Sequence, residues 1–237
     1  MVSYYSTADE IEMAGVDTVI LPIGSTEQHG PHLPVATDFL IASAVGGGIA
    51  GKLGAFLLPT LPISTCREHM GKKGSVWMNP DTFYHMLLDT VLSLKEQGFK
   101  KIIILLAHGG IFMAGPAIRE LNATNPDIKV VKVDIVQFFQ SDEMMKILEC
   151  KDNLHACEFE TSLILHLNEE LVRRDKIVDA VPNVPRDYLN YAPIFKYSQS
   201  GVWGKPSLAT KEKGEKVLEL LVKESVKYVN SVFKMFL

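Results

Sequence analysis

The sequence feature that most constrains the fold is the uninterrupted apolar run Ile102–Leu106. A strand that is apolar at every position, and not only at every second one, is typical of a parallel sheet covered on both faces. Further apolar runs at Val16–Leu21, Phe56–Leu58 and Val130–Val133 are separated by segments with helical periodicity. This alternation predicts an α/β fold, a three-layer α/β/α sandwich with a mostly parallel central sheet.

The expected helices have recognisable start and stop signals. We expect them to run from Ser6 or Thr7 through Met13, from Thr37 or Asp38, from Pro80, from about Phe112 to Leu121, and from about Thr210 to Phe233. Because Gly46-Gly47-Gly48 lacks a following Lys-Ser/Thr and has apolar neighbours, we interpret it as a site of close helix packing and not as a phosphate loop.

Length and composition limit the partners of the chain. A chain of 237 residues can form one domain with a sizeable core, so we expect a single domain over residues 1–237. Its 24 Lys and Arg against 28 Asp and Glu, with no basic block, argue against nucleic acid as a partner. No signal-peptide pattern and no membrane-length apolar segment occur, which predicts a cytoplasmic protein without a membrane partner.

The three cysteines, Cys66, Cys150 and Cys157, predict neither a disulfide framework nor a zinc knuckle. Their number is odd and no pair has C-x-x-C spacing. We therefore expect free thiols, two of which lie beside candidate site segments.

The stretch from Leu21 to Asp38 contains Glu, two His and Asp in a loop punctuated by Gly and Pro, directly after an expected strand. Glu27 and His29 would project to the same side if strand geometry persists, and Asp38 follows after a turn. Carboxylates and imidazoles suit zinc, manganese or iron. Taken alone, the Glu-x-His pair fits a solvated loop better than a metal site. His108 follows Ile102–Leu106, so parallel strands would bring it to the same sheet edge.

The longer string Glu-Gln-His-Gly-Pro-His-Leu-Pro at 27–34, followed by Thr37-Asp38, resembles the signature of the creatininase family of metal-dependent amidohydrolases. Further segments are similar to the same family: Glu68-His69 with Gly74-Ser75, His108-Gly109-Gly110, His155-Ala156-Cys157 with Glu160-Thr161-Ser162, and Trp203-Gly204-Lys205-Pro206-Ser207. The resemblance therefore covers nearly the whole chain, and it implies an enzyme whose substrate is a small molecule.

The resemblance implies a pair of divalent cations, Zn, Mn or Fe, held by Glu27, His29, Asp38, His108 and Glu160, with Asp38 as the bridging ligand. A water activated by the metals would attack a C–N bond. His155 is then the candidate general acid for the leaving nitrogen, with Glu160 as its neighbour in the catalytic set. Helix capping is the structural alternative for His155. The family also implies a homo-oligomer, perhaps a hexamer.

Four residues are candidates for substrate contact: Glu68, His69, Ser75 and Gly109. His32 is expected behind the ligands, whereas His85 and His166 fit apolar helix patterns and are expected to be structural. The basic trio Arg67, Lys72 and Lys73 could bind a phosphate.

Several departures from the family pattern argue against creatinine as the substrate. Members that open creatinine resemble one another in having Glu where this chain has Gly110, and Trp before His-Ala-Gly where it has Leu154. An amide, cyclic amide or formamide of another small polar metabolite is expected. Two alternatives remain, a diketo-inositol hydrolase of the 3-dehydro-scyllo-inosose type and a metal-binding relative without turnover.

Overall fold

The computed structural model describes residues 1–235. Four parallel strands form a sheet of order β2-β1-β3-β4. The strands are β1 (Thr18–Ile23), β2 (Phe56–Leu57), β3 (Lys101–Leu106) and β4 (Lys129–Asp134). The prediction of an α/β fold with a parallel sheet is confirmed, and the apolar run that suggested it is the central strand β3.

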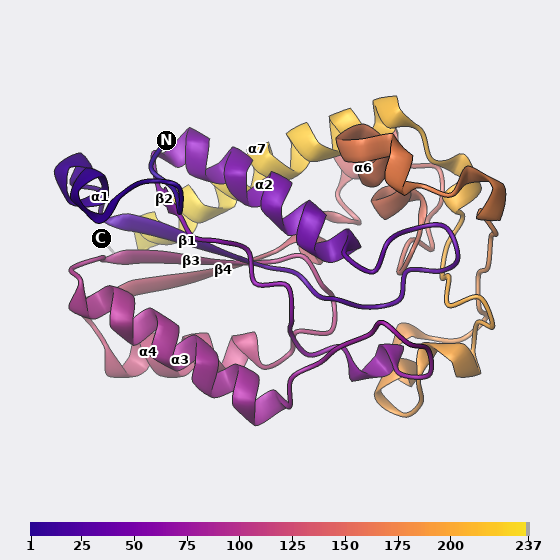
Figure 1. Cartoon of the computed structure of the whole chain (residues 1–237), viewed down its shortest axis with the longest axis horizontal. Helices are drawn as coiled ribbons and strands as arrows, with labels where there is room; N and C mark the ends of the chain where they lie inside the picture. The colour runs from indigo at the N-terminus through magenta and orange to yellow at the C-terminus, as the bar shows by residue number, and fades with distance from the viewer. Residues whose placement is uncertain (236–237) are drawn as a thin grey trace.

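Helices cover both faces of this sheet (Figure 1). The helices are α1 (Ala8–Ala14), α2 (Thr37–Leu53), α3 (Pro80–Glu96), α4 (Ala114–Thr124), α5 (Asp142–Ile147), α6 (Glu158–Asn168) and α7 (Lys211–Met235). Helices α2, α6 and α7 lie on one face, and α3 and α4 lie on the other. The layers therefore follow the order that the sequence predicted.

Short 3-10 helices occur within the remaining loops. They are η1 (Arg67–His69), η2 (Ile135–Phe138), η3 (Glu169–Leu171), η4 (Arg174–Lys176), η5 (Arg186–Asn190), η6 (Ile194–Lys196) and η7 (Pro206–Leu208). The segment between α6 and α7 contains only such short helices. It passes over the carboxyl ends of the strands (Figure 1).

Alternation along β3 explains why a run of apolar residues is needed. Ile103 and Leu105 pack toward α2, α6 and α7, whereas Ile102 and Ile104 pack toward α3 and α4. Because successive strand side chains point to opposite faces, each face of the sheet has its own core.

The helix boundaries follow the signals read from the sequence. Thr7 caps α1 in a capping box with Glu10, and Gly15 ends it in the left-handed conformation with φ of 59°. At the triple glycine of α2, a side chain at Gly46 would approach Pro22 to 2.6 Å, and one at Gly48 would approach Val222 to 2.5 Å. These close approaches agree with the packing interpretation.

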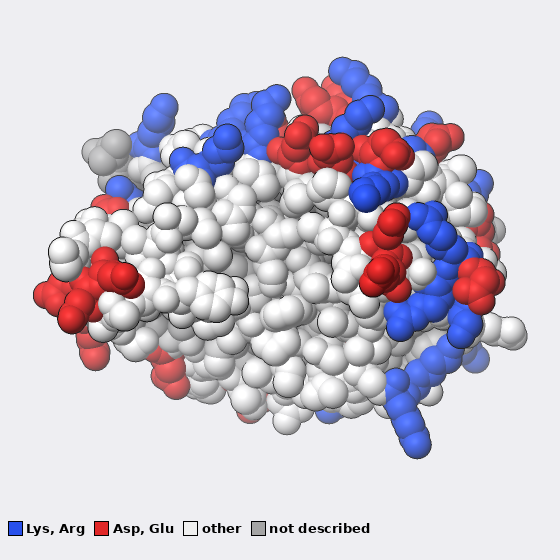
Figure 2. All heavy atoms as spheres, turned by 45° about the horizontal axis from the view of Figure 1, so that its top comes forward, with Lys and Arg blue, Asp and Glu red and all other residues white. Residues whose placement is uncertain are grey.

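Charged side chains are unevenly distributed on the surface. Figure 2 shows a face whose central part is free of Lys, Arg, Asp and Glu, while such residues gather along its upper and right-hand rims. In the sequence of α2, no charged residue occurs between Asp38 and Lys52. Within residues 1–235, no helix is both long and apolar enough to cross a membrane.

Candidate metal centre

The site lies at the carboxyl edge of the sheet, where three loops and the starts of two helices converge. Glu27 and His29 follow β1, His69 lies on η1 after β2, and His108 follows β3. Asp38 is in the first turn of α2, and Glu160 is in the first turn of α6. The parallel sheet itself brings the strand ends together, because every strand delivers its carboxyl end to one edge.

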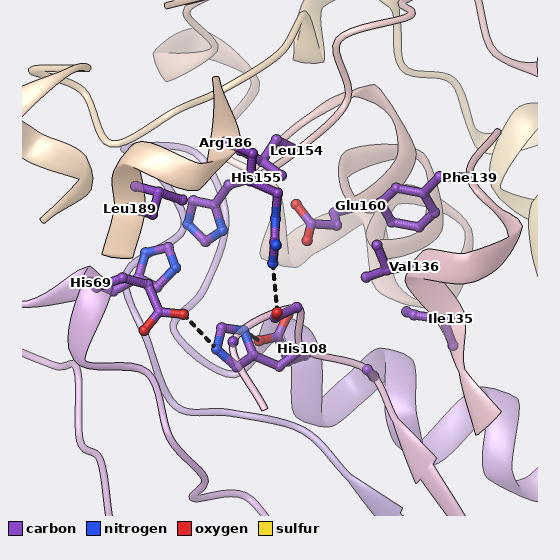
Figure 3. Close-up of a pocket in the computed structure, with 15 residues that line it drawn as sticks. His69, His108, Ile135, Val136, Phe139, Leu154, His155, Glu160, Arg186 and Leu189 are labelled. Atoms are coloured by element: carbon purple, nitrogen blue, oxygen red, sulfur yellow. Dashed lines mark hydrogen bonds and ion pairs between the residues drawn. The ribbon is translucent and has the colours of Figure 1, made fainter. Parts of the chain in front are cut away.

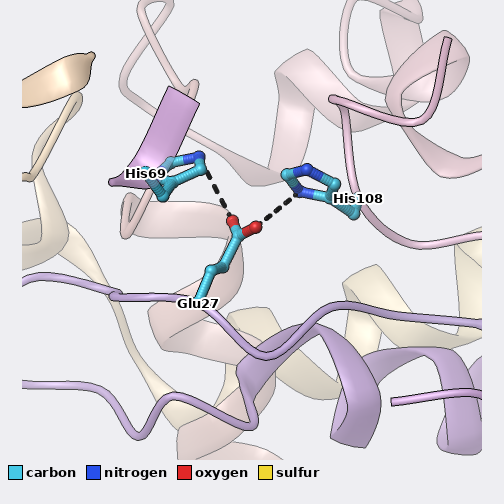
Figure 4. A group of neighbouring side chains, drawn as sticks. All are labelled: Glu27, His69 and His108. Carbon is cyan, nitrogen blue, oxygen red and sulfur yellow. Dashed lines mark ion pairs between the residues drawn. The ribbon is translucent and has the colours of Figure 1, made fainter. Parts of the chain in front are cut away.

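Six imidazole and carboxylate side chains form a buried cluster, together with His155. Three groups of three have ligand atoms within 4.8 Å of one another: Glu27, His69 and His108; Glu27, His29 and His155; and His29, Asp38 and Glu160. The first group is shown in Figure 4, where both imidazoles point toward the Glu27 carboxylate. Its distances are 3.3 Å from His69 Nε2 to Glu27 Oε1 and 3.2 Å from His108 Nδ1 to Glu27 Oε2.

Asp38 joins the two ends of the cluster. Its Oδ1 lies 3.2 Å from His29 Nε2, and its Oδ2 lies 3.3 Å from His108 Nδ1. One carboxylate therefore faces both the His29 and the His108 sides. This is the arrangement that a bridging ligand requires.

Glu160 has two roles in the structure. Its Oε2 accepts a hydrogen bond from the backbone N–H of Cys157 at 3.3 Å, which caps α6. Its Oε1 lies 3.7 Å from His29 Nε2. The helix cap therefore fixes the carboxylate so that its second oxygen points into the cluster.

The donor set fits divalent cations. Among the described residues, Glu27 Oε1 and Oε2, His29 Nε2, Asp38 Oδ2 and His108 Nε2 are buried without a hydrogen-bond partner of good geometry. Buried polar atoms of this kind are costly unless something pairs with them. Imidazole nitrogens and carboxylate oxygens are the ligands of zinc and manganese.

In the metal-free chain, protons compensate the buried carboxylates. Burial alone would lower the pKa of His29, but Asp38 and Glu160 outweigh it and hold that pKa well above its usual value. Burial alone would also lower the pKa of His108, but Glu27 and Asp38 outweigh burial and hold that pKa well above its usual value. Burial raises the pKa of Glu27 to about 7. Metal ions would replace such protons, because ligands bind metal in their deprotonated forms.

His155 is neutral near pH 7 in this environment. Burial and the neighbouring His29 lower its pKa to about 4. Its Nε2 lies 2.7 Å from the carbonyl oxygen of Gln28, whereas its Nδ1 lies 3.6 Å from Glu27 Oε1. Nδ1 is thus the atom that faces the cluster.

Gln28 is a site residue that sequence reasoning did not single out. Its amide nitrogen lies 3.0 Å from both His69 Nδ1 and His155 Nε2 and donates to the carbonyl of Gly201. Gly201 has φ of 78°, and a side chain there would collide with the Gln28 amide. The position inside the matched string was the only signal for Gln28 in the sequence.

The four expected substrate contacts have different surroundings. His69 belongs to a candidate ligand group, although it was expected only as a substrate contact. Ser75 accepts from the Gln28 backbone N–H and donates to the His69 carbonyl, which ties two loops together. Glu68 and Gly109 line the pocket beside the cluster.

The other histidines and the cysteines lie outside these ligand groups. His32 Nε2 contacts Thr161 Oγ1 at 2.9 Å, behind His29. All three cysteines are free and buried, and burial raises the pKa of Cys66 to about 12. Of the basic trio Arg67, Lys72 and Lys73, only Arg67 lines a cavity next to the site.

A charged residue from the segment after α6 completes the pocket. Arg186 on η5 extends toward the cluster, and its Nη2 donates to the Gly109 carbonyl at 2.6 Å (Figure 3). Nothing in the local sequence marks Arg186, since its place depends on how a long irregular segment crosses the site.

The family model described as creatinine amidohydrolase, Creatininase, matches residues 5–229. A mycofactocin precursor peptide peptidase of Mycolicibacterium smegmatis is 28% identical over 219 residues, which cover 87% of this chain and 82% of the relative. A creatinine amidohydrolase of Pseudomonas putida is 28% identical over 227 residues, with 88% and 87% covered. A 3-dehydro-scyllo-inosose hydrolase of Thermotoga maritima is 26% identical over 246 residues, with 93% and 79% covered.

Solved structures agree with these relatives. A crystal structure of creatinine amidohydrolase and a structure described as creatininase Mn each superpose with a TM-score of 0.84 and 25% identity. Each comparison covers 99% of this chain and 98% of the other.

Proposed function

Because the chain belongs to the creatininase family, we propose that it is a metal-dependent hydrolase that cleaves a C–N bond in a small polar metabolite. The bond would belong to an amide, a cyclic amide or a formamide. The observation that carries this proposal is the buried cluster in which Asp38 faces His29 with one oxygen and His108 with the other.

Two cations would fit the two ends of the cluster. The group Glu27, His69 and His108 shares no residue with the group His29, Asp38 and Glu160. Asp38 lies between the two groups and would be the bridging ligand. When bound, such a pair activates a water and polarises the substrate carbonyl.

The residues around the cluster supply positioning and proton transfer. Gln28 fixes the ring of His69 through its amide nitrogen, and its backbone carbonyl accepts from His155 Nε2, so both rings keep one orientation. A neutral His155 can accept a proton at Nδ1 and return it to the leaving nitrogen, as general acid–base catalysis requires. His155→Ala should therefore lower kcat by about 100-fold or more while metal content is retained. Unchanged turnover would remove His155 from this role.

Creatinine is a poor substrate candidate because of Gly110. The space that a side chain at position 110 would use is filled by the Glu68 carboxylate. Leu154, where the creatinine-opening members have Trp, lines the pocket and offers no aromatic ring for a flat substrate.

The decisive measurement combines metal content with turnover. Elemental analysis of protein purified without chelator should give close to two cations per chain, and Glu27→Gln and Asp38→Asn should each reduce that number. Hydrolysis should then be tested on amides, cyclic amides, formamides and diketo-polyols. No metal in the unmodified protein would overturn the proposal, and metal without any C–N hydrolysis would favour a non-catalytic relative.

The diketo-polyol arm tests a second candidate function. The 3-dehydro-scyllo-inosose hydrolase of Thermotoga maritima is similar to this chain over 93% of its length. If the protein hydrolyses a cyclic diketone and none of the amides, its function is hydrolytic ring opening of a diketo-polyol by the same cluster.

We further propose that the protein is a homo-oligomer. The uncharged central part of the face in Figure 2 supports this, because charged residues are depleted at the cores of protein interfaces. Light scattering coupled to size-exclusion chromatography should give a mass above the 26.3 kDa of one chain. A mass of one chain would refute the proposal.

A further inference from the structure

Arg186 is the single Lys or Arg among the described residues that line the pocket beside the metal cluster. Its side chain comes from η5 and points toward His108, between His155 and Glu160 in the view of Figure 3. Besides the hydrogen bond to the Gly109 carbonyl, its guanidinium carbon lies 5.5 Å from the centre of the Phe112 ring. These two contacts hold the guanidinium in place but use only part of its hydrogen-bonding capacity.

Arg186 stands at the boundary between two cavities. The inner one, beside the cluster, has a volume of about 40 Å³, and the outer one has about 480 Å³. Glu68, Gly110, Arg186 and Leu189 line both cavities. A substrate in the outer cavity therefore reaches the cluster by passing the guanidinium.

The volumes indicate how a substrate would divide between the cavities. The inner volume exceeds the roughly 10–15 Å³ that a cavity needs to hold one water, so it accepts a small group such as a carbonyl. The outer volume accepts a group the size of an amino acid or larger. The scissile carbonyl would enter the inner cavity, and the rest of the molecule would remain outside beside Arg186.

Of the two cations that line the outer cavity, Arg186 is the one that also reaches the inner cavity. Glu68 Oε1 lies 3.3 Å from His108 Nε2, so this carboxylate already faces a neighbour. Arg67 has one ring contact, with Trp77, and one hydrogen bond, to Asn79, but it lines the outer cavity alone. A guanidinium fork is suited to bind a carboxylate or a phosphate through two parallel hydrogen bonds.

Gly109 makes this arrangement possible. A side chain at position 109 would come within 3.0 Å of Arg186 Nη2. The glycine after His108 thus leaves room for the guanidinium directly above the cluster.

We propose that Arg186 binds an anionic group of the substrate, next to the scissile C–N bond. The substrate class is an amide that carries a carboxylate or phosphate close to the amide nitrogen or carbonyl, such as an N-acyl amino acid or a short peptide with a free carboxyl end. This inference rests on the proposed function for the hydrolytic step, whereas anion binding by Arg186 does not depend on turnover.

The test compares matched ligands that differ in one charge. N-acetyl amino acids, their carboxamides and the corresponding aminophosphonates would be assayed with the metal-loaded protein, Arg186→Gln and Arg186→Lys. Arg186→Gln should raise KM by about 10-fold or more for the anionic substrates and less than about twofold for the carboxamides. Arg186→Lys should recover part of the loss. The control is Arg174→Gln, which removes an exposed arginine paired with Glu169 away from the site.

A binding measurement separates this inference from the proposed function. Isothermal titration with N-acetylglycine or inorganic phosphate gives Kd whether or not any substrate is cleaved, and metal content should be equal in all variants. If no amide is hydrolysed but Arg186→Gln weakens anion binding about 10-fold, the hydrolase proposal fails and the anion site stands. A preference for phosphate over carboxylate would identify the anion as a phosphate. Equal effects of Arg186→Gln on charged and uncharged ligands would overturn the inference and leave Arg186 as a tether of η5.

Discussion

Two adjacent glycines determine which charged side chains reach the metal cluster. Gly109 leaves space for Arg186, and Gly110 leaves space for the carboxylate of Glu68. These side chains come from segments far from His108 in the sequence. The site thus receives a cation and a carboxylate that the strand-end loop itself does not carry.

Glu68→Gln tests the role of Glu68, and Gly110→Ala tests the space around it. The added methyl group would collide with both the Glu68 carboxylate and His108 Nε2, so it would disturb the ligand and its neighbour together. Loss of a carboxylate that orients a ligating histidine typically weakens metal binding by about 10–100-fold. We therefore expect Gly110→Ala and Glu68→Gln each to weaken metal binding by a factor in this range. Metal titration with a competing chelator measures the effect. Gly115→Ala is the matched control, since a side chain there meets no atom within 4 Å. If both test variants bind metal with the affinity of the wild type, Glu68 does not orient His108 for metal binding.

His32 predicts a pH dependence of stability. Burial and the nearby His29 lower the pKa of His32 to about 4. In the unfolded chain His32 has an ordinary histidine pKa near 6.5, so it binds a proton more readily there than in the folded chain. The free energy of unfolding therefore falls as pH drops from about 6.5 to about 4. The contribution lost is at most about 3 kcal/mol.

Thermal unfolding of wild type and His32→Gln between pH 7.5 and 4 measures this contribution. The substitution itself should destabilise at neutral pH, because Thr161 loses its partner. The difference between the two proteins should then shrink as pH falls. Parallel curves across the whole range would show that His32 does not titrate with folding.

At the scale of elements, the glycines of α2 serve different purposes. A side chain at Gly46 would meet the rigid ring of Pro22 on β1, whereas one at Gly47 meets no atom within 4 Å. Helix α2 therefore needs a glycine at position 46 to lie close to the sheet. At position 47 no such contact exists, so glycine there has only its low helix propensity.

The variants Gly46→Ala and Gly47→Ala should change stability in opposite directions. Overpacking against Pro22 should destabilise by about 1–3 kcal/mol. In an unobstructed helix interior, Ala should stabilise by about 0.5–1 kcal/mol. Urea unfolding of both variants gives the two values. Destabilisation of equal size in both would mean that the backbone of α2, and not its contact with β1, limits the substitution.

The elements were largely predictable, because each depends on local signals. Thr7 and Gly15 bound α1, and Pro80 opens α3 at its first position, as capping chemistry requires. The expected starts of β1 and α4 were each two residues early. The strand of β1 begins after Asp17, whose carbonyl accepts from Lys100 and Lys101. Such boundaries depend on partners that are distant in sequence.

The site was predictable in part, for the same reason. Glu27, His29 and His108 could be placed together because parallel strands end at one edge, whereas Asp38 and Glu160 were added as ligands only through the family resemblance. The positions of Arg186 and Gln28, and the entry of His69 into a ligand group, depend on long loops folded over that edge. Periodicity and spacing carry no information about such loops. The exact substrate and the oligomeric state stay predictions.

At the scale of the whole molecule, metal should act as a cross-link. The ligand groups join the loops after β1, β2 and β3 to the start of α2 and α6. A cation that binds only the folded state stabilises it by about 4 kcal/mol at a thousandfold excess over Kd. For a chain of this size, that corresponds to an increase in Tm of about 8–16 °C.

Calorimetry before and after chelation tests this expectation. Chelator should lower Tm, and returned zinc or manganese should restore it. In Glu27→Gln the same treatment should have a smaller effect, because one carboxylate shared by two ligand groups is lost. Identical Tm values with and without metal would show that the cluster is not a cation site in the folded protein.

The packing of α6 on α7 has a consequence for the metal site. Glu160 lies on α6, and α6 is held by α7 through the approach of Gly214 to the Ser162 carbonyl and the ion pair of Lys213 with buried Glu158. The described part of α7 supplies no residue to the ligand groups, yet it supports the helix that positions one of their carboxylates. A bound cation would therefore report that the contact between these two helices has formed.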